Sequence, residues 1–123
     1  MTRSVRALAP ALIWAAAVWT VGGLETTPSV PAGLGLDKAA HFAMYGVLGF
    51  LLARGWSAAS WRGAWLLPIA IALLLGVADE LRQRTVPGRS GEVADWLADV
   101  GGASAGVYLA LRIARRQRID DRA

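Results

Sequence analysis

The sequence predicts an all-α fold: a polytopic membrane protein in which a four-helix transmembrane bundle has both its N- and C-termini in the cytoplasm. Of the 123 residues, 55% are hydrophobic, and they gather in four runs without Asp, Glu, Lys or Arg, at 7–24, 39–53, 63–78 and 100–111. The arginines lie mainly in the segments that this topology leaves in the cytoplasm. The four runs leave no material for a separate soluble domain, so residues 1–123 are expected to form a single domain.

The formal net charge of +4 is distributed as the positive-inside rule requires. With a cytoplasmic N-terminus, the cytoplasmic segments hold nine arginines and the outer segments hold four cationic residues: inside Arg3, Arg6, Arg54, Arg62, Arg112, Arg115, Arg116, Arg118 and Arg122; outside Lys38, Arg82, Arg84 and Arg89. The reverse topology would break the rule. The basic C-terminal segment is therefore interpreted as an anchor beside anionic lipid, and no nucleic-acid partner is expected.

The first helix is expected at residues 5–24. Of the four apolar runs, only the one in this helix has the usual length of a membrane span. Pro10 falls in its first turns, where a missing N–H donor is tolerated best. A cleaved signal peptide is the alternative, because Arg3 and Arg6 precede the run. The run is longer than the usual signal core, which favours an uncleaved helix. Residues 25–36, with two prolines and two glycines between 28 and 35, are expected to form an outer loop.

The second and third helices are expected at residues 37–54 and 63–84. A cytoplasmic turn at 55–62 joins them, and its tryptophans suit the inner membrane interface. Pro68 is expected to kink the third helix, with neighbouring helices satisfying the carbonyl that it frees. Both apolar runs are short for a membrane span, so the charged residues at their ends are expected to lie near or within the bilayer boundary.

The fourth helix is expected at residues 92–116, after an outer turn marked by a Pro-Gly dipeptide. Ser90 is its candidate N-cap. Gly102 and Gly106 are four residues apart, a pair of small residues that allows another helix to approach closely. That helix belongs either to the same chain or to a second copy in a homodimer.

Polar side chains lie at the ends of the last three helices, which this topology brings to one face of the membrane. Their spacing of three or four residues places them on one stripe of each helix: Asp37, His41 and Tyr45; Glu80 and Gln83; Asp95 and Asp99. If Arg112 lies at the inner boundary of the hydrocarbon layer, the helical rise per residue places Asp99 about 10 Å below the outer boundary of that layer. Ionisable groups at such depth are costly and are usually paired or functional. We therefore expect one polar site, open to the outer leaflet.

Several of these residues also have a purely structural interpretation. Asp37 could cap the second helix, and the nearby Asp79 could simply end the third helix in the headgroup region. Glu80 and Arg84, four residues apart, could form an exposed ion pair worth a few tenths of a kcal/mol. Tyr45 could serve packing alone.

Together, these residues resemble the signature of the VanZ-like family of small bacterial membrane proteins. The matching segments are 37–45, 79–83, 86–91, 95–99 and 101–103. The chain departs from the family at Asp99, where asparagine is usual. The resemblance implies a multi-pass protein of the bacterial cytoplasmic (inner) membrane, whose namesake is associated with teicoplanin resistance. It also implies these site positions: Asp37, His41, Glu80, Gln83, Arg89, Asp95 and Asp99.

The leading functional interpretation is an enzyme that hydrolyses or transfers part of an amphiphilic or lipid-linked substrate. His41 would be the general acid or base, with its tautomer held by Asp37 one turn away. Asp95 or Glu80 would activate water or bind a cation. Arg89 would hold a phosphate or carboxylate, for which its forked donors are suited. The other expected substrate contacts are Gln83, Asp99 and Tyr45.

Two other functions stay open. The same site could bind lipid headgroups or lipoglycopeptides without catalysis, or the chain could be a small ion-coupled carrier, although no inverted repeat is visible. No cofactor is certain. A divalent cation is open, because the acidic residues suit magnesium or calcium better than zinc. The absence of cysteine excludes a thiol nucleophile.

Overall fold

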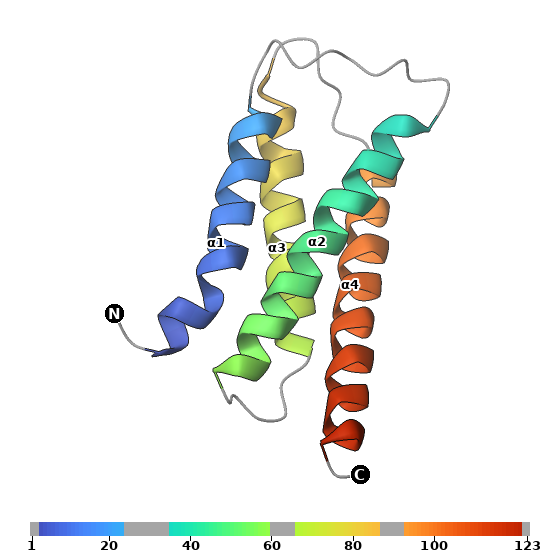
Figure 1. The fold of residues 1–123 in the computed structure, drawn as a ribbon. Helices are drawn as coiled ribbons and strands as arrows, with labels where there is room; N and C mark the ends of the chain where they lie inside the picture. Colours follow the sequence, from blue (N-terminus) through green and yellow to red (C-terminus); the bar gives the residue numbers. More distant parts are fainter. Residues whose placement is uncertain (1–2, 24–34, 60–65, 87–92, 122–123) are drawn as a thin grey trace.

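The structure is a computed structural model that describes residues 3–23, 35–59, 66–86 and 93–121. These residues form four α-helices and no strand: α1 (Arg3–Gly22), α2 (Leu36–Ala58), α3 (Leu66–Gln83) and α4 (Val93–Asp120). The helices run alternately up and down, so α1 and α3 end where α2 and α4 begin (Figure 1). The prediction of an all-helical chain with four helices is confirmed.

The helix boundaries correct the prediction in three places. α2 continues to Ala58, so the predicted turn at 55–62 is wrong in its first half. Gly55 lies inside the helix and packs on α1, where a Cβ atom at this position would lie 2.6 Å from the Ala7 carbonyl oxygen. α4 likewise continues to Asp120. α3 ends at Gln83, one residue before the predicted end; its described part begins at Leu66, with Pro68 as the third residue, and the predicted start at residue 63 lies outside the described residues.

The closest contact in the fold is between α2 and α4, and glycines make it possible. A Cβ atom at Gly102 would overlap the carbonyl group of Phe42, and one at Gly106 would overlap the carbonyl group of Gly46. From the other side, a Cβ atom at Gly49 would overlap the backbone of Ala103. The predicted close approach at Gly102 and Gly106 is confirmed, and the partner is α2 of the same chain. A homodimer would need another face and stays a prediction.

The remaining helices pack around this pair through apolar side chains. Tyr45 and Leu48 of α2 join Ala72 of α3 and Ala103 of α4 in one buried cluster, which Ala11 and other residues of α1 complete. The Trp14 indole of α1 also donates a hydrogen bond to the Met44 carbonyl oxygen at 2.9 Å. The contacts of α1 are thus mainly with α2. Within α1, Pro10 lies beyond the first turn, deeper in the helix than expected.

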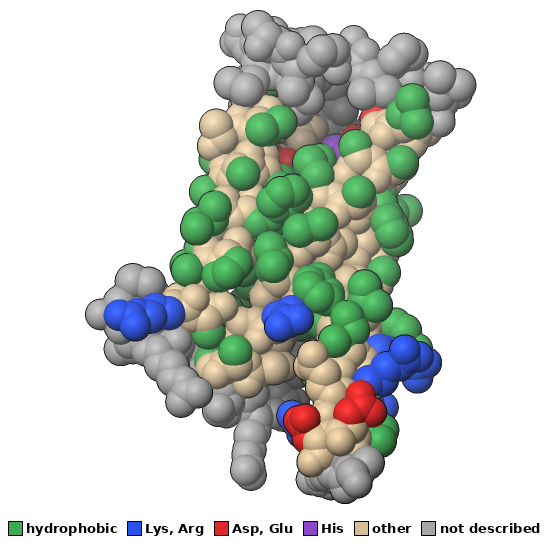
Figure 2. Space-filling model, viewed as in Figure 1, with side chains coloured by type: hydrophobic (Ala, Val, Ile, Leu, Met, Phe, Trp, Pro, Cys, Tyr) green, Lys and Arg blue, Asp and Glu red, His purple; other side chains and the backbone are tan. Residues whose placement is uncertain are grey.

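The outer surface of the helices is apolar. Large hydrophobic side chains are exposed on every helix, for example Ile13 and Leu74, each 71% exposed. In Figure 2 hydrophobic side chains cover the middle of the visible face, while Lys and Arg side chains gather toward the lower end. Within the described residues, two helices are long and apolar enough to cross a membrane by length and composition, over Val5–Gly22 and Val93–Asp120. α4 meets this criterion although its uncharged run is short, because the helix extends beyond the run at 100–111 at both ends.

The α2–α4 contact generates a stability prediction. Gly106→Val should lower the free energy of unfolding by about 1–3 kcal/mol, because the added carbons force the two backbones apart. The neighbouring Ala105→Val is the matched control, since residue 105 is exposed and has room for the larger side chain. Thermal unfolding in detergent micelles measures both. Equal melting temperatures for the two variants would contradict the proposed role of the contact.

Candidate functional site

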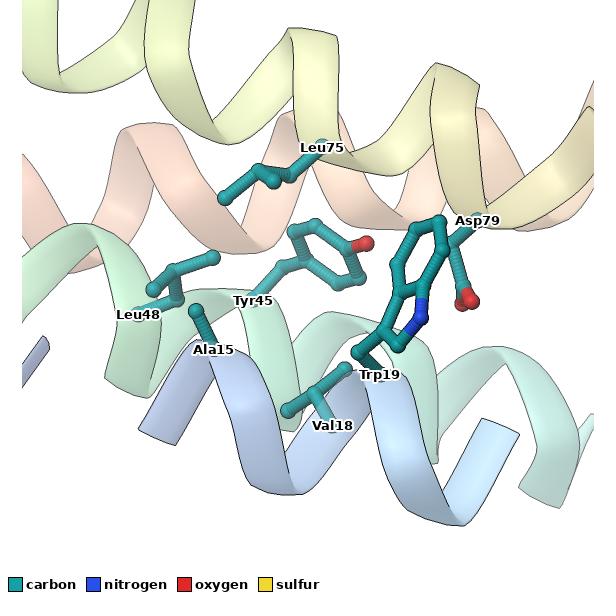
Figure 3. Close-up of a pocket in the computed structure, with 7 residues that line it drawn as sticks. All are labelled: Ala15, Val18, Trp19, Tyr45, Leu48, Leu75 and Asp79. Atoms are coloured by element: carbon teal, nitrogen blue, oxygen red, sulfur yellow. The ribbon is translucent and has the colours of Figure 1, made fainter. Parts of the chain in front are cut away.

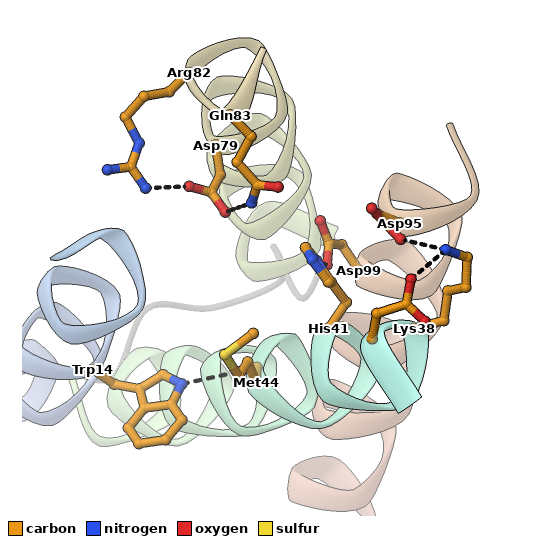
Figure 4. Close-up of polar contacts among 10 residues, drawn as sticks. Trp14, Lys38, His41, Met44, Asp79, Arg82, Gln83, Asp95 and Asp99 are labelled. Carbon is orange, nitrogen blue, oxygen red and sulfur yellow. Dashed lines mark hydrogen bonds and ion pairs between the residues drawn. The ribbon is translucent and has the colours of Figure 1, made fainter. Parts of the chain in front are cut away.

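The polar side chains predicted on three helices meet at one end of the fold. α2 contributes its first turns, α3 its last turns and α4 its first turns, and all of these lie at the upper end in Figure 1. We define the polar cluster as Asp37, Lys38, His41, Asp79, Glu80, Arg82, Gln83, Asp95 and Asp99, most of which Figure 4 shows. It includes six of the eight predicted site residues. Of the other two, Tyr45 lies deeper, and Arg89 is outside the described residues, as is the candidate N-cap Ser90.

His41 of α2 is paired with Asp99 of α4. The His41 Nδ1 atom lies 2.9 Å from the Asp99 Oδ1 atom, and the side chains are 13% and 2% exposed. With the carboxylate as acceptor, Nδ1 carries the proton and Nε2 is the nitrogen that can accept another. The expectation that Asp37 holds this imidazole is wrong. The close α2–α4 contact brings a partner from 58 residues away in the sequence instead.

Asp37 instead pairs with Lys38, which the sequence indicated only as one of the cations of the outer segments. The Lys38 Nζ atom lies 2.6 Å from Asp37 Oδ2 and 3.0 Å from Asp95 Oδ1, so one ammonium group links α2 to α4. Both acids lie in the first turn of their helix, where the helix dipole favours negative charge. The capping alternative for Asp37 is wrong, because the N-cap position of α2 is Gly35, with φ 63°.

A second ion pair is centred on Asp79, which is 4% exposed. Its carboxylate accepts hydrogen bonds from Arg82 Nη2 at 2.6 Å and from Gln83 Nε2 at 2.9 Å. The Arg82 guanidinium also lies over the Trp19 ring of α1, 4.3 Å from its centroid. The interpretation that Asp79 merely ends α3 in the headgroup region is wrong. The spacing of three and four residues from Asp79 to Arg82 and Gln83 is the signal that could have indicated this network.

Glu80 of α3 is a buried acid that belongs to neither of these two groups of ion pairs. The residue is 7% exposed, and its Oε1 atom is buried with no hydrogen-bond partner among the described residues. The carboxylates of Asp95 and Asp99 repel its charge, whereas Arg84 and His41 attract it. Because the side chain is buried, the exposed ion pair with Arg84 that the spacing allowed is not what the structure shows. A buried carboxyl oxygen without a partner is costly, and such groups are common where a proton or a ligand is bound.

Tyr45 lies below the polar cluster, in the core. It is 2% exposed and lines a small pocket between α1, α2 and α3, together with Trp19 and Asp79 (Figure 3). Its hydroxyl group points toward the end of this pocket where Asp79 lies. The pocket has about 10 Å³ of free volume, roughly enough for one water molecule. Its structural role is packing, and contact between Tyr45 and a substrate stays a prediction.

The acids of the polar cluster do not form a metal site in the described part of the chain. No group of three or more His, Cys, Asp or Glu residues there could hold a metal ion. Lys38 lies between the carboxylates of Asp37 and Asp95, where its ammonium group takes the place that a metal cation would need, and Arg82 pairs with Asp79. The arrangement instead provides one histidine oriented by an acid, beside a buried carboxyl group. These are the components of proton transfer.

Comparison with known proteins identifies the family. The model of the VanZ/LLP1 family matches residues 3–115, which include all four helices over most of their length. The chain therefore belongs to the VanZ/LLP1 family, as its motifs predicted. No curated protein and no solved structure matches the chain.

The burial of Glu80 generates a second stability prediction. Glu80→Gln should raise the free energy of unfolding by about 1 kcal/mol, because it removes a buried charge that nearby acids repel. Asp120→Asn is the control, since Asp120 is exposed at the other end of α4 and its replacement should change little. Chemical denaturation in mixed micelles measures both variants. A clear loss of stability in Glu80→Gln would mean that the carboxylate has a stabilising partner.

Proposed function

We propose that this member of the VanZ/LLP1 family is a multi-pass protein of the bacterial cytoplasmic membrane that hydrolyses or transfers part of an amphiphilic, lipid-linked substrate. The observation that carries the proposal is the pairing of His41 with the buried Asp99 at 2.9 Å, beside the buried carboxyl group of Glu80. A histidine oriented by an acid is a common arrangement for general base catalysis.

The surroundings of the polar cluster support an amphiphilic substrate. Large apolar side chains are exposed on the same helical turns that supply the polar groups: Leu36, Phe42, Leu81, Val93 and Leu97, between 46% and 67% exposed. A ligand that reaches the polar groups at this end therefore also meets apolar side chains. Lipids and lipid-linked molecules combine a polar headgroup with chains that match such a surface.

The charge distribution supports a site in the outer leaflet. The end of the fold opposite the polar cluster carries the exposed arginines of the last turns of α4, Arg112, Arg115, Arg116 and Arg118. The positive-inside rule assigns that end to the cytoplasm. All four helices would then cross the membrane, with short apolar stretches in α2 and α3 that end at the polar cluster.

In the proposed reaction His41 acts through its Nε2 atom. That nitrogen accepts a proton from water as the water oxygen attacks an acyl or phosphoryl centre of the substrate. The Asp99 carboxylate stabilises the imidazolium that forms, and the imidazolium then returns the proton to the leaving oxygen. Asp37, Glu80 and Asp95 are the acids proposed to assist, by orienting water or the leaving group. Arg89 is proposed to hold the anionic part of the substrate.

The composition of the polar cluster favours a second function, recognition without catalysis. Among the described residues, the polar cluster contains no serine, threonine or cysteine, and the reaction proposed above uses water as the nucleophile. In the alternative function the same groups bind a lipid headgroup or a lipoglycopeptide. Both functions depend on His41 and Asp99, and they differ in whether a product forms.

The decisive test is product formation. Purified protein incubated with bacterial envelope lipids should yield a new species by mass spectrometry. His41→Gln should reduce its rate of formation by about 10²–10⁴-fold, the usual contribution of a general base. Asp99→Asn should reduce the rate less, because asparagine can still accept the Nδ1–H hydrogen bond. Asp120→Asn should leave the rate unchanged. Lipid binding without any new species would reject catalysis in favour of recognition.

The family resemblance also generates a prediction in cells. Expression of this chain in a susceptible bacterium should raise the teicoplanin concentration needed to stop growth, through a change in envelope lipids or in drug access. His41→Gln, expressed at the same level, should remove the effect, whereas Asp120→Asn should retain it. If the protein is expressed in the membrane and the inhibitory teicoplanin concentration does not change, the predicted role in resistance is contradicted.

A further inference from the structure

A groove opens at the end of the fold opposite the polar cluster, between the C-terminal parts of α2 and α4. It has about 240 Å³ of free space, against about 10 Å³ in the pocket beside Tyr45. Its polar side chains are Arg54, Ser57 and Gln117. Ligand sites for drug-sized molecules measure about 300–1,000 Å³, so this groove has room for a headgroup rather than a whole lipid.

The α2–α4 contact explains why the groove exists. The two backbones touch at Gly46, Gly49, Gly102 and Gly106, and because the helices cross there, they diverge toward their C-terminal ends. Figure 1 shows the separation at the lower end of the two helices. The side chains that line the space between them include alanines at positions 58, 110 and 114, which are too small to fill it.

The chemistry of the groove suits an anion with several oxygen atoms. Arg54 supplies a guanidinium group, and Ser57 and Gln117 supply a hydroxyl and an amide donor. None of the residues that line the groove is acidic. The Arg54 guanidinium also lies 5.9 Å from the Phe50 ring centroid, which helps to hold its position on α2.

The position of the groove along the helices identifies the source of that anion. In α2 no Asp, Glu, Lys or Arg lies between Lys38 and Arg54, and in α4 none lies between Asp99 and Arg112. Arg54 and Arg112 therefore mark where the apolar part of each helix ends. A groove at this level lies at the headgroup depth of a bilayer that covers the apolar surface.

We infer that the groove binds the phosphate headgroup of an anionic glycerophospholipid, whose acyl chains remain in the bilayer. The phosphate oxygens accept hydrogen bonds from Arg54, Ser57 and Gln117, and Ala110 and Ile113 contact the glycerol and the first methylene groups. This site is separate from the polar cluster and does not depend on the reaction proposed there. Its role is to hold the C-terminal ends of α2 and α4 at a fixed separation.

The test measures lipid retention by native mass spectrometry of the full chain released from micelles that contain phosphatidylglycerol or phosphatidylcholine. The wild-type chain should retain phosphatidylglycerol preferentially. Arg54→Gln should reduce that retention about fivefold, as expected for the loss of one arginine near an anionic lipid. Arg112→Gln is the matched control, because Arg112 is an exposed arginine near the same end that does not line the groove.

A second variant keeps the test decisive if Arg54→Gln does not fold. Ala114→Leu fills the groove without changing any charge, and it should also reduce phosphatidylglycerol retention while Arg112→Gln does not. Equal retention of both lipids by the wild-type chain would overturn the inference, as would full retention in Ala114→Leu. Complete displacement of the lipid by millimolar inorganic phosphate would also overturn it, because the site would then recognise free phosphate.

Discussion

The backbone contact between α2 and α4 is the constraint on which the rest of the structure depends. At Gly49 on one helix and at Gly102 and Gly106 on the other, a Cβ atom would overlap the backbone of the facing helix. This close approach determines which residues face each other on either side of it. Toward one end it places His41 against Asp99 and Lys38 against Asp95. Toward the other end the helices separate and the Arg54 groove opens. Two chemically different regions thus follow from one set of glycines.

The sequence was sufficient to predict the features that depend on spacing within a helix. The four helices, the common end of their polar stripes and the close approach at Gly102 and Gly106 all follow from local periodicity and alternating direction. The partner of His41 did not follow, because spacing along one helix suggests Asp37 but contains no information about how a neighbouring helix is rotated. The same limit explains why Asp79 was treated as a helix end. Only the packing of α1 and α3 shows that Asp79, Arg82 and Trp19 form one network.

The polar cluster holds more acids than cations. Lys38 lies between Asp37 and Asp95, and Arg82 pairs with Asp79, which lowers the cost of burying these acids. Glu80 forms no ion pair with Lys38 or Arg82; one of its carboxyl oxygens is buried without a hydrogen-bond partner among the described residues, and Asp95 and Asp99 repel its charge. A fold optimised for stability alone would not retain such a group. Its presence beside His41 is the physical reason to regard this end of the fold as a functional site rather than a set of structural ion pairs.

His41 is the only histidine in the chain, and this has a practical consequence for its chemistry. Any imidazole resonance in a nitrogen-15 magnetic resonance spectrum of the protein belongs to this one ring. The two ring nitrogens have distinct chemical shifts in each tautomer, so a single labelled sample reports which nitrogen carries the proton. The tautomer of the His41 ring beside Asp99 can therefore be observed directly in the intact protein, without assignment of the remaining spectrum.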